Sequence, residues 1–313
     1  MRLLKTALIA GLAAAATLSA CGGGGGRVEP FRPARVISFG DEQSAIRPDG
    51  AKYTVNATDP KTGMVTCAAN PLWNQRLASN FRLAFPGCNP DMRLEASGRM
   101  HAASGAKVTD VTAQIDRQFA AGGFGPTDLV TLMAGANDVI ELYAQYPAQS
   151  ADALGDAAQA RGAQLAVQVN RIVNADGRIV LSTIHDLGQT PFAIREKAMH
   201  PDTDRAALLA ELSRRFNTGL RLNIRNDGRH IGLVLTDELV ARMVRFPTQL
   251  YGVADAVSAS CNAGVAVEAC TDRTLVDKAT AASHLWATAT AFGPVIHANL
   301  GNLAVQRATN NPF

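Results

Sequence analysis

The sequence is poor in aromatic residues and has no cluster of positive charge. Phe, Trp and Tyr make up 5% of its 313 residues, and 30 Lys and Arg stand against 27 Asp and Glu. The basic residues form no run and no aromatic stripe lies among them, so nucleic-acid binding has no support. Hydrophobic residues reach 47% of the chain, which is enough to build one large domain with a substantial core.

Metal-binding and redox motifs are also missing from the sequence. No two of the six histidines stand at ligand spacing, and the cysteines form neither a zinc motif nor C-x-x-C. We therefore expect no metal and no cofactor. Four cysteines instead fit structural disulfides in an oxidising compartment. Of the three possible connectivities, the most local joins Cys67 to Cys88 and Cys261 to Cys270.

The N-terminal segment is too short for a comfortable membrane span. Arg2 and Lys5 precede a short apolar core at residues 7–18, a pattern typical of an export signal. The run L-S-A-C that ends at Cys21 resembles a bacterial lipobox. That resemblance implies cleavage before Cys21 and lipidation of this cysteine, and the alternative is an ordinary secretory signal.

These features predict a lipoprotein signal peptide at 1–20, a lipidated cysteine with a glycine-rich tether at 21–30, and a single domain at 31–313. The glycines at 22–26 suit a flexible tether. Glycine in place of aspartate directly after Cys21 favours the outer membrane, by analogy with other lipoproteins. We therefore expect the protein in the bacterial cell envelope, attached to the lipid membrane through an N-terminal acyl anchor.

Strand and helix patterns alternate along the whole domain. This alternation predicts an α/β fold with a parallel, doubly wound sheet. A helix is expected shortly after the first strand, and another directly after residue 138. The other predicted elements are strands at 36–39, 93–103, 128–134, 178–184 and 231–235, and helices at 71–84, 108–119, 151–174, 202–226, 237–245 and 294–307.

Five short blocks occur in register with these elements. F-G-D at 39–41 follows the first strand, A-S-G-A at 103–106 precedes a helix, and G-A-N-D at 135–138 follows the third strand. D-L-G-Q-T-P lies at 186–191, and L-W-A at 285–287 is followed by Pro294 and His297. In this order the blocks resemble those of the SGNH, or GDSL, esterase/lipase family. The resemblance implies a three-layer α/β/α sandwich with a five-stranded parallel sheet.

The family's chemistry is ester hydrolysis by a serine, a histidine and an aspartate, with backbone and asparagine donors holding the oxyanion. The resemblance assigns two of these donors to Gly105 and Asn137. At the serine position, however, this chain has Glu42, and the aspartate and histidine positions hold Thr288 and Ala291. All three catalytic side chains are thus replaced together. A catalytic triad typically contributes a factor of about a million to the rate of hydrolysis, and most of this contribution should be lost here.

Substitute nucleophiles and bases have little support in the sequence. Ser44 is expected to assist the start of a helix. His297 fits structural packing, and His284 lies before the Leu-Trp pair, where only a loop rearrangement would bring it to the site. His185 and Asp186 are adjacent on an extended segment, so their side chains point apart.

Glu42 therefore has two interpretations. It is either a general base that activates water, or a polar residue that fills a pocket that no longer catalyses a reaction and accepts hydrogen bonds from Asn137 or nearby N–H groups. An ionised carboxylate would repel a developing oxyanion, which favours the second. The sequence predicts an impaired pseudoenzyme that binds a ligand or partner, such as an acyl or glycan ester. The alternatives are an active ester hydrolase using Glu42-activated water or a relocated nucleophile, and a purely structural envelope lipoprotein.

Overall fold

The computed structural model describes residues 29–89, 97–225 and 227–310. The predicted signal peptide, Cys21 and most of the predicted tether lie outside the described residues. Within the chain, Phe31–Phe313 form one compact unit. No helix among the described residues is long and apolar enough to cross a membrane.

The core of this unit is a sheet of five parallel strands in the order β2-β1-β3-β4-β5. This confirms the predicted five-stranded parallel sheet. β2 lies within the segment 93–103 that was expected to hold it, although residues 93–96 lie outside the described part of the chain. The strands are β1 (Arg35–Gly40), β2 (Gly98–Met100), β3 (Asp128–Met133), β4 (Arg178–Ser182) and β5 (Ile231–Val234).

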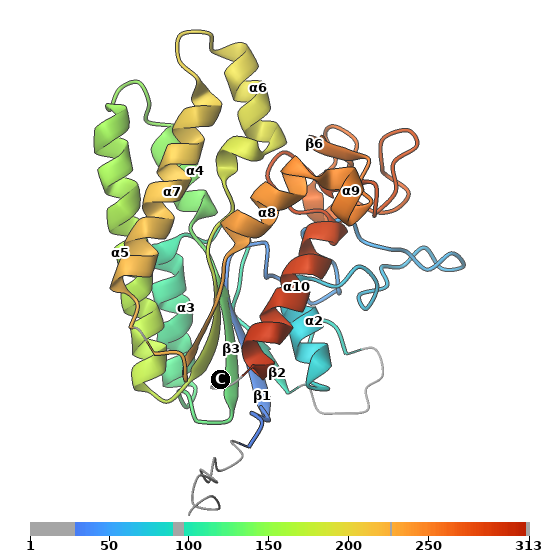
Figure 1. Ribbon diagram of the computed structural model, residues 1–313. Helices are drawn as coiled ribbons and strands as arrows, with labels where there is room; N and C mark the ends of the chain where they lie inside the picture. The colour runs from blue at the N-terminus through green and yellow to red at the C-terminus, as the bar shows by residue number, and fades with distance from the viewer. Residues whose placement is uncertain (1–28, 90–96, 226, 311–313) are drawn as a thin grey trace, which may run out of the picture. The chain divides into compact units, whose positions relative to one another are not determined.

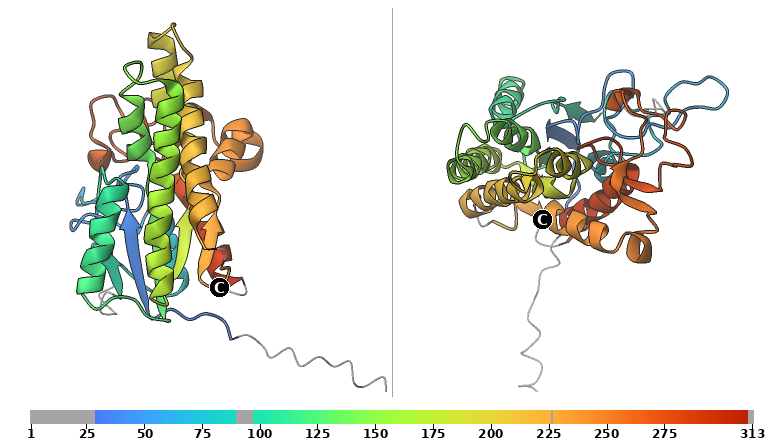
Figure 2. Two further views of the ribbon diagram at one scale, coloured as in Figure 1. Left: turned by 90° about the vertical axis from the view of Figure 1, so that its left-hand side faces the viewer. Right: turned by 90° about the horizontal axis from the view of Figure 1, so that it is seen from above.

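Helices cover both faces of the sheet, as Figures 1 and 2 show. Side chains alternate along a strand, so Val130 and Leu132 of β3 pack into one core while Leu129 and Met133 pack into the other. One layer comprises α3 (Val108–Ala120), α4 (Ala136–Tyr143), α5 (Ala151–Asn174) and α7 (Arg205–Asn223). The other comprises α2 (Trp73–Asn80), α8 (Thr236–Arg245) and α10 (Pro294–Thr309).

The helix predicted shortly after the first strand is absent from the described residues. Residues 42–44 form a tight turn instead, and the chain then runs without a regular element to α2. The backbone N–H groups of Gln43 and Ser44 donate to the side chain and to the carbonyl of Asp41. These bonds give the turn a local alternative to the helix.

Several smaller elements were not expected from the sequence. They lie between β4 and α10, where the loops after the strands gather near the upper end of the sheet in Figure 1. These elements are α6 (Pro191–Met199), α9 (Pro247–Tyr251), the short 3-10 helices η2 (Leu187–Gln189) and η3 (Val267–Ala269), and the paired strands β6 (Asp255–Ala259) and β7 (His284–Trp286).

Two disulfides tie the irregular segments down. Cys67 is bonded to Cys88, and Cys261 is bonded to Cys270. The most local of the three connectivities is therefore confirmed. Closing such loops stabilises the fold mainly by restricting the unfolded chain.

Candidate active site

The candidate site begins where β1 ends in a sharp turn at Gly40. This residue has φ +120°, and a Cβ atom here would lie 1.9 Å from the Met133 carbonyl oxygen on β3, so only glycine fits. The Gln114 side chain of α3 accepts from Gly40 N at 2.8 Å and donates to Gly40 O at 3.0 Å. The backbone position from which residue 42 projects is therefore tightly fixed.

The Glu42 carboxylate receives two hydrogen bonds on one oxygen. Gly105 N donates to Glu42 Oε2 at 2.9 Å, and Asn137 Nδ2 donates to the same oxygen at 3.0 Å. Asn137 is the second residue of α4, and its amide also donates to Ala106 O at 3.2 Å. The loop carrying Gly105 is held because Ala103 N donates to Gly40 O at 3.0 Å. Three residues singled out by the sequence are thus in direct contact.

The covalent geometry of glutamate explains this contact. In an acyl-serine, the chain from Cβ runs through Oγ to the acyl carbon and its carbonyl oxygen. In Glu42 the corresponding atoms are Cγ, Cδ and Oε2. From Cβ to the terminal oxygen, the side chain therefore spans the same number of bonds as an acylated serine does to its carbonyl oxygen, and this terminal oxygen accepts from Gly105 N and Asn137 Nδ2.

Two buried carboxyl groups, Asp41 and Asp138, directly neighbour Glu42 and Asn137 in the sequence. Asp41 is fully buried, and its Oδ2 has no hydrogen-bond partner among the described residues. Burial raises the pKa of Asp41 well above its usual value, and the neighbouring charge of Glu42 raises it further. Burial also raises the pKa of Asp138, although Val108 N and the Arg161 guanidinium donate to its two oxygens. These surroundings disfavour additional negative charge.

The loop that carries Thr288 and Ala291 packs beside the residue after Glu42. Gln43 Nε2 donates to Thr290 O at 3.4 Å, and Phe292 N donates to Gln43 Oε1 at 3.3 Å. Ala291 N lies 3.4 Å from Thr288 Oγ1, its acceptor. The loop is therefore beside the turn, but neither a hydroxyl nor a methyl group can act as a base at neutral pH.

Ser44 is not placed as a nucleophile. It is fully buried, and its Oγ accepts from Trp73 Nε1 at 3.1 Å. It lies in the turn after β1, so its predicted role at a helix start is not observed. Within the described part of the chain, no hydrogen bond joins a histidine ring to Ser44 or Glu42.

Two histidines are buried on either side of Phe292. Ring centroids lie 4.7 Å apart for His185 and Phe292, and 5.6 Å apart for His297 and Phe292. Burial lowers the pKa of both rings to about 3, with a smaller contribution at His297 from the charge of Lys52. Both histidines are therefore neutral packing groups.

A serine, a histidine and an aspartate meet elsewhere, an arrangement missed at the sequence level because β6 and β7 were not predicted. Ser283 Oγ lies 2.8 Å from His284 Nδ1, and His284 Nε2 lies 3.7 Å from Asp255 Oδ2. The Ser283 hydroxyl also donates to Thr280 O at 2.9 Å. With its hydrogen used there, Oγ acts as the acceptor for Nδ1–H, which is the reverse of a nucleophile and its base.

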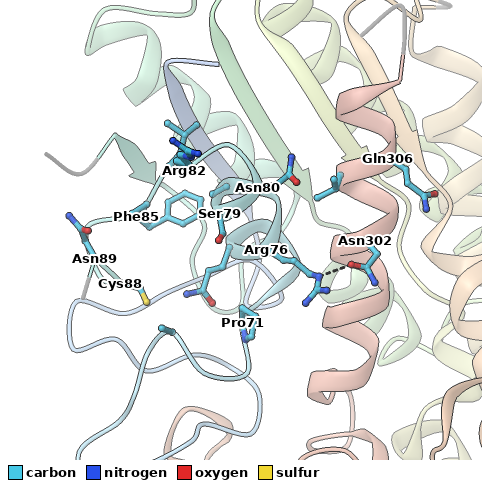
Figure 3. Close-up of a pocket in the computed structure, with 16 residues that line it drawn as sticks. Pro71, Arg76, Ser79, Asn80, Arg82, Phe85, Cys88, Asn89, Asn302 and Gln306 are labelled. Carbon is cyan, nitrogen blue, oxygen red and sulfur yellow. Dashed lines mark hydrogen bonds between the residues drawn. The ribbon is translucent and has the colours of Figure 1, made fainter. Parts of the chain in front are cut away.

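None of the four main cavities among the described residues is lined by Glu42, Gly105 or Asn137. One, of about 950 Å³, lies between α2 and α10, where Arg76 Nε donates to Asn302 Oδ1 at 2.6 Å (Figure 3). Another, of about 500 Å³, lies between α4 and α6. No group of three or more His, Cys, Asp or Glu within the described ranges could hold a metal ion.

The sheet order, the helical layers and the turn after β1 define an SGNH-hydrolase-like α/β fold. The chain belongs to the family described as GDSL-like Lipase/Acylhydrolase, whose sequence model matches residues 56–278. The matched range contains Gly105 and Asn137. It leaves out Glu42, Thr288 and Ala291, so the match does not bear on the catalytic triad.

Solved structures with a similar fold include a member of the lipolytic protein G-D-S-L family from Veillonella parvula DSM 2008. It is 10% identical, with a TM-score of 0.40, over 88% of this chain and 95% of that chain. Axe2, an acetylxylan esterase from Geobacillus stearothermophilus, is 13% identical, with a TM-score of 0.43, over 90% and 97% of the two chains. No curated protein matches the chain by sequence.

Proposed function

We propose that this protein is a hydrolytically impaired GDSL-family pseudoenzyme that binds a ligand or partner. The observation that carries the proposal is the double hydrogen bond from Gly105 N and Asn137 Nδ2 to Glu42 Oε2. A substrate carbonyl would need this position, and the carboxylate already fills it. An acyl or glycan ester is the ligand class that the family membership favours.

Turnover of short-chain aryl esters tests this proposal. The purified mature protein should hydrolyse p-nitrophenyl acetate no faster than its Glu42→Ala variant, because no residue acts as nucleophile and base. The rate enhancement that a catalytic triad would contribute, and that should be missing here, is of order a million-fold. Saturable turnover by the parent that disappears in Glu42→Ala would overturn the proposal.

The second candidate is an active hydrolase in which Glu42 activates water. One observation favours it: within the described residues, no hydrogen bond involves Glu42 Oε1, the atom that would accept a proton from water. Measurable turnover without labelling by a serine-directed phosphonate would support this candidate. Labelling of Ser44 would support a relocated nucleophile, and its burial under Trp73 argues against that result.

We also propose that the protein is a lipoprotein of the bacterial cell envelope, anchored by an acylated Cys21 and directed to the outer membrane. The lipobox-like run at 18–21 and the glycines at 22–26 support this proposal. The two disulfides are consistent with an oxidising compartment.

A further inference from the structure

The cavity between α4 and α6 has the size and composition of a small-molecule site. Its volume is about 500 Å³, within the usual range for ligand pockets of roughly 300–1,000 Å³. Tyr143 and Ile140 come from α4, Phe192 and Glu196 come from α6, and Arg205 opens α7. The cavity is therefore built mainly on helices, which hold its walls in fixed positions.

Aromatic rings form much of its wall. Tyr143 and Phe192 pack edge to face, with ring centroids 5.8 Å apart. Tyr146 lies in the segment after α4, and the Arg205 guanidinium carbon is 4.6 Å from its ring centroid. These contacts hold the rings in place and give the cavity flat apolar surfaces.

Two charged groups of opposite sign also line the cavity, and each can form further hydrogen bonds. Tyr143 Oη donates to Glu196 Oε2 at 2.7 Å, which leaves lone pairs on the carboxylate. The Arg205 side chain is only 7% exposed, and one of its terminal nitrogens donates to Asp202 at 2.9 Å. Its Nε is buried without a hydrogen-bond partner among the described residues. A buried unpaired N–H is costly, so this donor favours a ligand that supplies an acceptor.

The combination of groups restricts the ligand. An alkyl chain would leave Arg205 Nε unpaired and the remaining lone pairs of Glu196 unused, which is unfavourable in a largely buried site. An anion would be repelled by Glu196, and a cation by Arg205. A neutral ring with several hydroxyl groups can accept from Arg205, donate to Glu196 and place its C–H face against Tyr146 or Phe192.

We propose that the α4–α6 cavity binds a neutral sugar ring. This inference rests on the proposed function, namely that the protein binds a ligand, and it names the chemical class of that ligand. Asn137 and Tyr143 are six residues apart on α4, which corresponds to about 9 Å along the helix. Phe192 N donates to Ala289 O, in the loop of Thr288 and Ala291, at 3.0 Å. The sugar site therefore lies next to the candidate active site.

Binding of neutral tetrasaccharides to the mature protein tests the proposal. The probes are tetramers of glucose, xylose, mannose, galactose and N-acetylglucosamine, measured by saturation-transfer NMR and titration calorimetry. At least one should bind with a Kd of about 1 mM or tighter. Arg205→Lys and Glu196→Gln should each weaken it about tenfold or more, because each removes a hydrogen bond to a charged group.

Met199→Ala is the matched control, since Met199 lies exposed on α6 and does not line the cavity. This variant should bind as the parent does. The Tm of each cavity variant shows whether that variant is folded, and if Arg205→Lys does not fold, the test rests on Glu196→Gln. The proposal is overturned if no tetramer binds with a Kd of about 1 mM or tighter, if both cavity variants bind normally, or if decanoate binds there in place of sugars. The probes carry no ester, so failure here leaves the proposed loss of hydrolysis standing.

Discussion

Glu42 shows how one side chain can bring two hydrogen-bond donors from different elements onto a single oxygen atom. A serine at this position would end at Oγ, short of the donors, and a substrate oxygen would complete the contact. Glutamate reaches the donors itself, through Cγ and Cδ. Its contacts with Gly105 N and Asn137 Nδ2 thus keep the donors occupied.

Two glycines beside Glu42 should differ sharply in their tolerance of alanine. Gly40→Ala should destabilise the fold by more than about 4 kcal/mol, because a positive φ is combined with a clash against the Met133 carbonyl. Gly105→Ala should cost only about 1–2 kcal/mol, since φ is +73° but no atom lies within 4 Å of the added methyl. Urea unfolding measures both values. Equal losses would show that the contact with β3 does not fix the turn.

The packing of His185 and His297 joins the end of β4 to α10 through Phe292. The unfolded chain protonates histidine below about pH 6.5, whereas the two folded rings stay neutral to about pH 3. Their contribution to stability is therefore complete above pH 6.5 and is lost as the pH falls. On going from pH 7 to pH 5, each ring should lower the free energy of unfolding by about 2 kcal/mol.

Urea unfolding at pH 7 and pH 5 checks this, by comparing how much stability the parent and a histidine variant lose between the two pH values. His297→Leu should lose about 2 kcal/mol less than the parent on going from pH 7 to pH 5. The buried carboxyls with raised pKa, such as Asp41, act in the opposite direction but are common to both proteins. Met199→Leu, at an exposed methionine of α6 that does not titrate, is the control and should follow the parent. Identical behaviour of His297→Leu and the parent would contradict the assignment of a neutral buried ring.

At the scale of the whole molecule, the membrane anchor is the main prediction. The full-length protein expressed in a bacterial host should enter the detergent phase on Triton X-114 partitioning, and Cys21→Ser should abolish this by removing the acylated side chain. Gly22→Asp keeps Cys21 and should retain lipidation while changing the membrane that holds the protein. Detergent-phase partitioning of Cys21→Ser, or a mature N-terminus other than Cys21 by mass spectrometry, would contradict the prediction.

Regular elements with clear periodicity were predictable, whereas locally bonded turns were not. Residues 151–174 were predicted as a helix and form α5 with the same bounds, because its apolar positions follow the helical period. The turn after β1 was misread as a helix start, since the hydrogen bonds of Asp41 compete with helix formation there. α6 and the β6–β7 pair depend on contacts across the fold, such as Phe192 N to Ala289 O, that no local pattern reports.

The sequence by itself predicted the parallel α/β fold and favoured the two local disulfides that the structure contains. Alternation of apolar segments and the spacing of the blocks carry that information locally. Only the tertiary structure decided that one oxygen of Glu42 receives both donors, that Ser44 is enclosed under Trp73, and that Arg205 and Glu196 face one cavity. Each of these facts joins residues far apart in the chain, and their geometry is set by packing across the sheet.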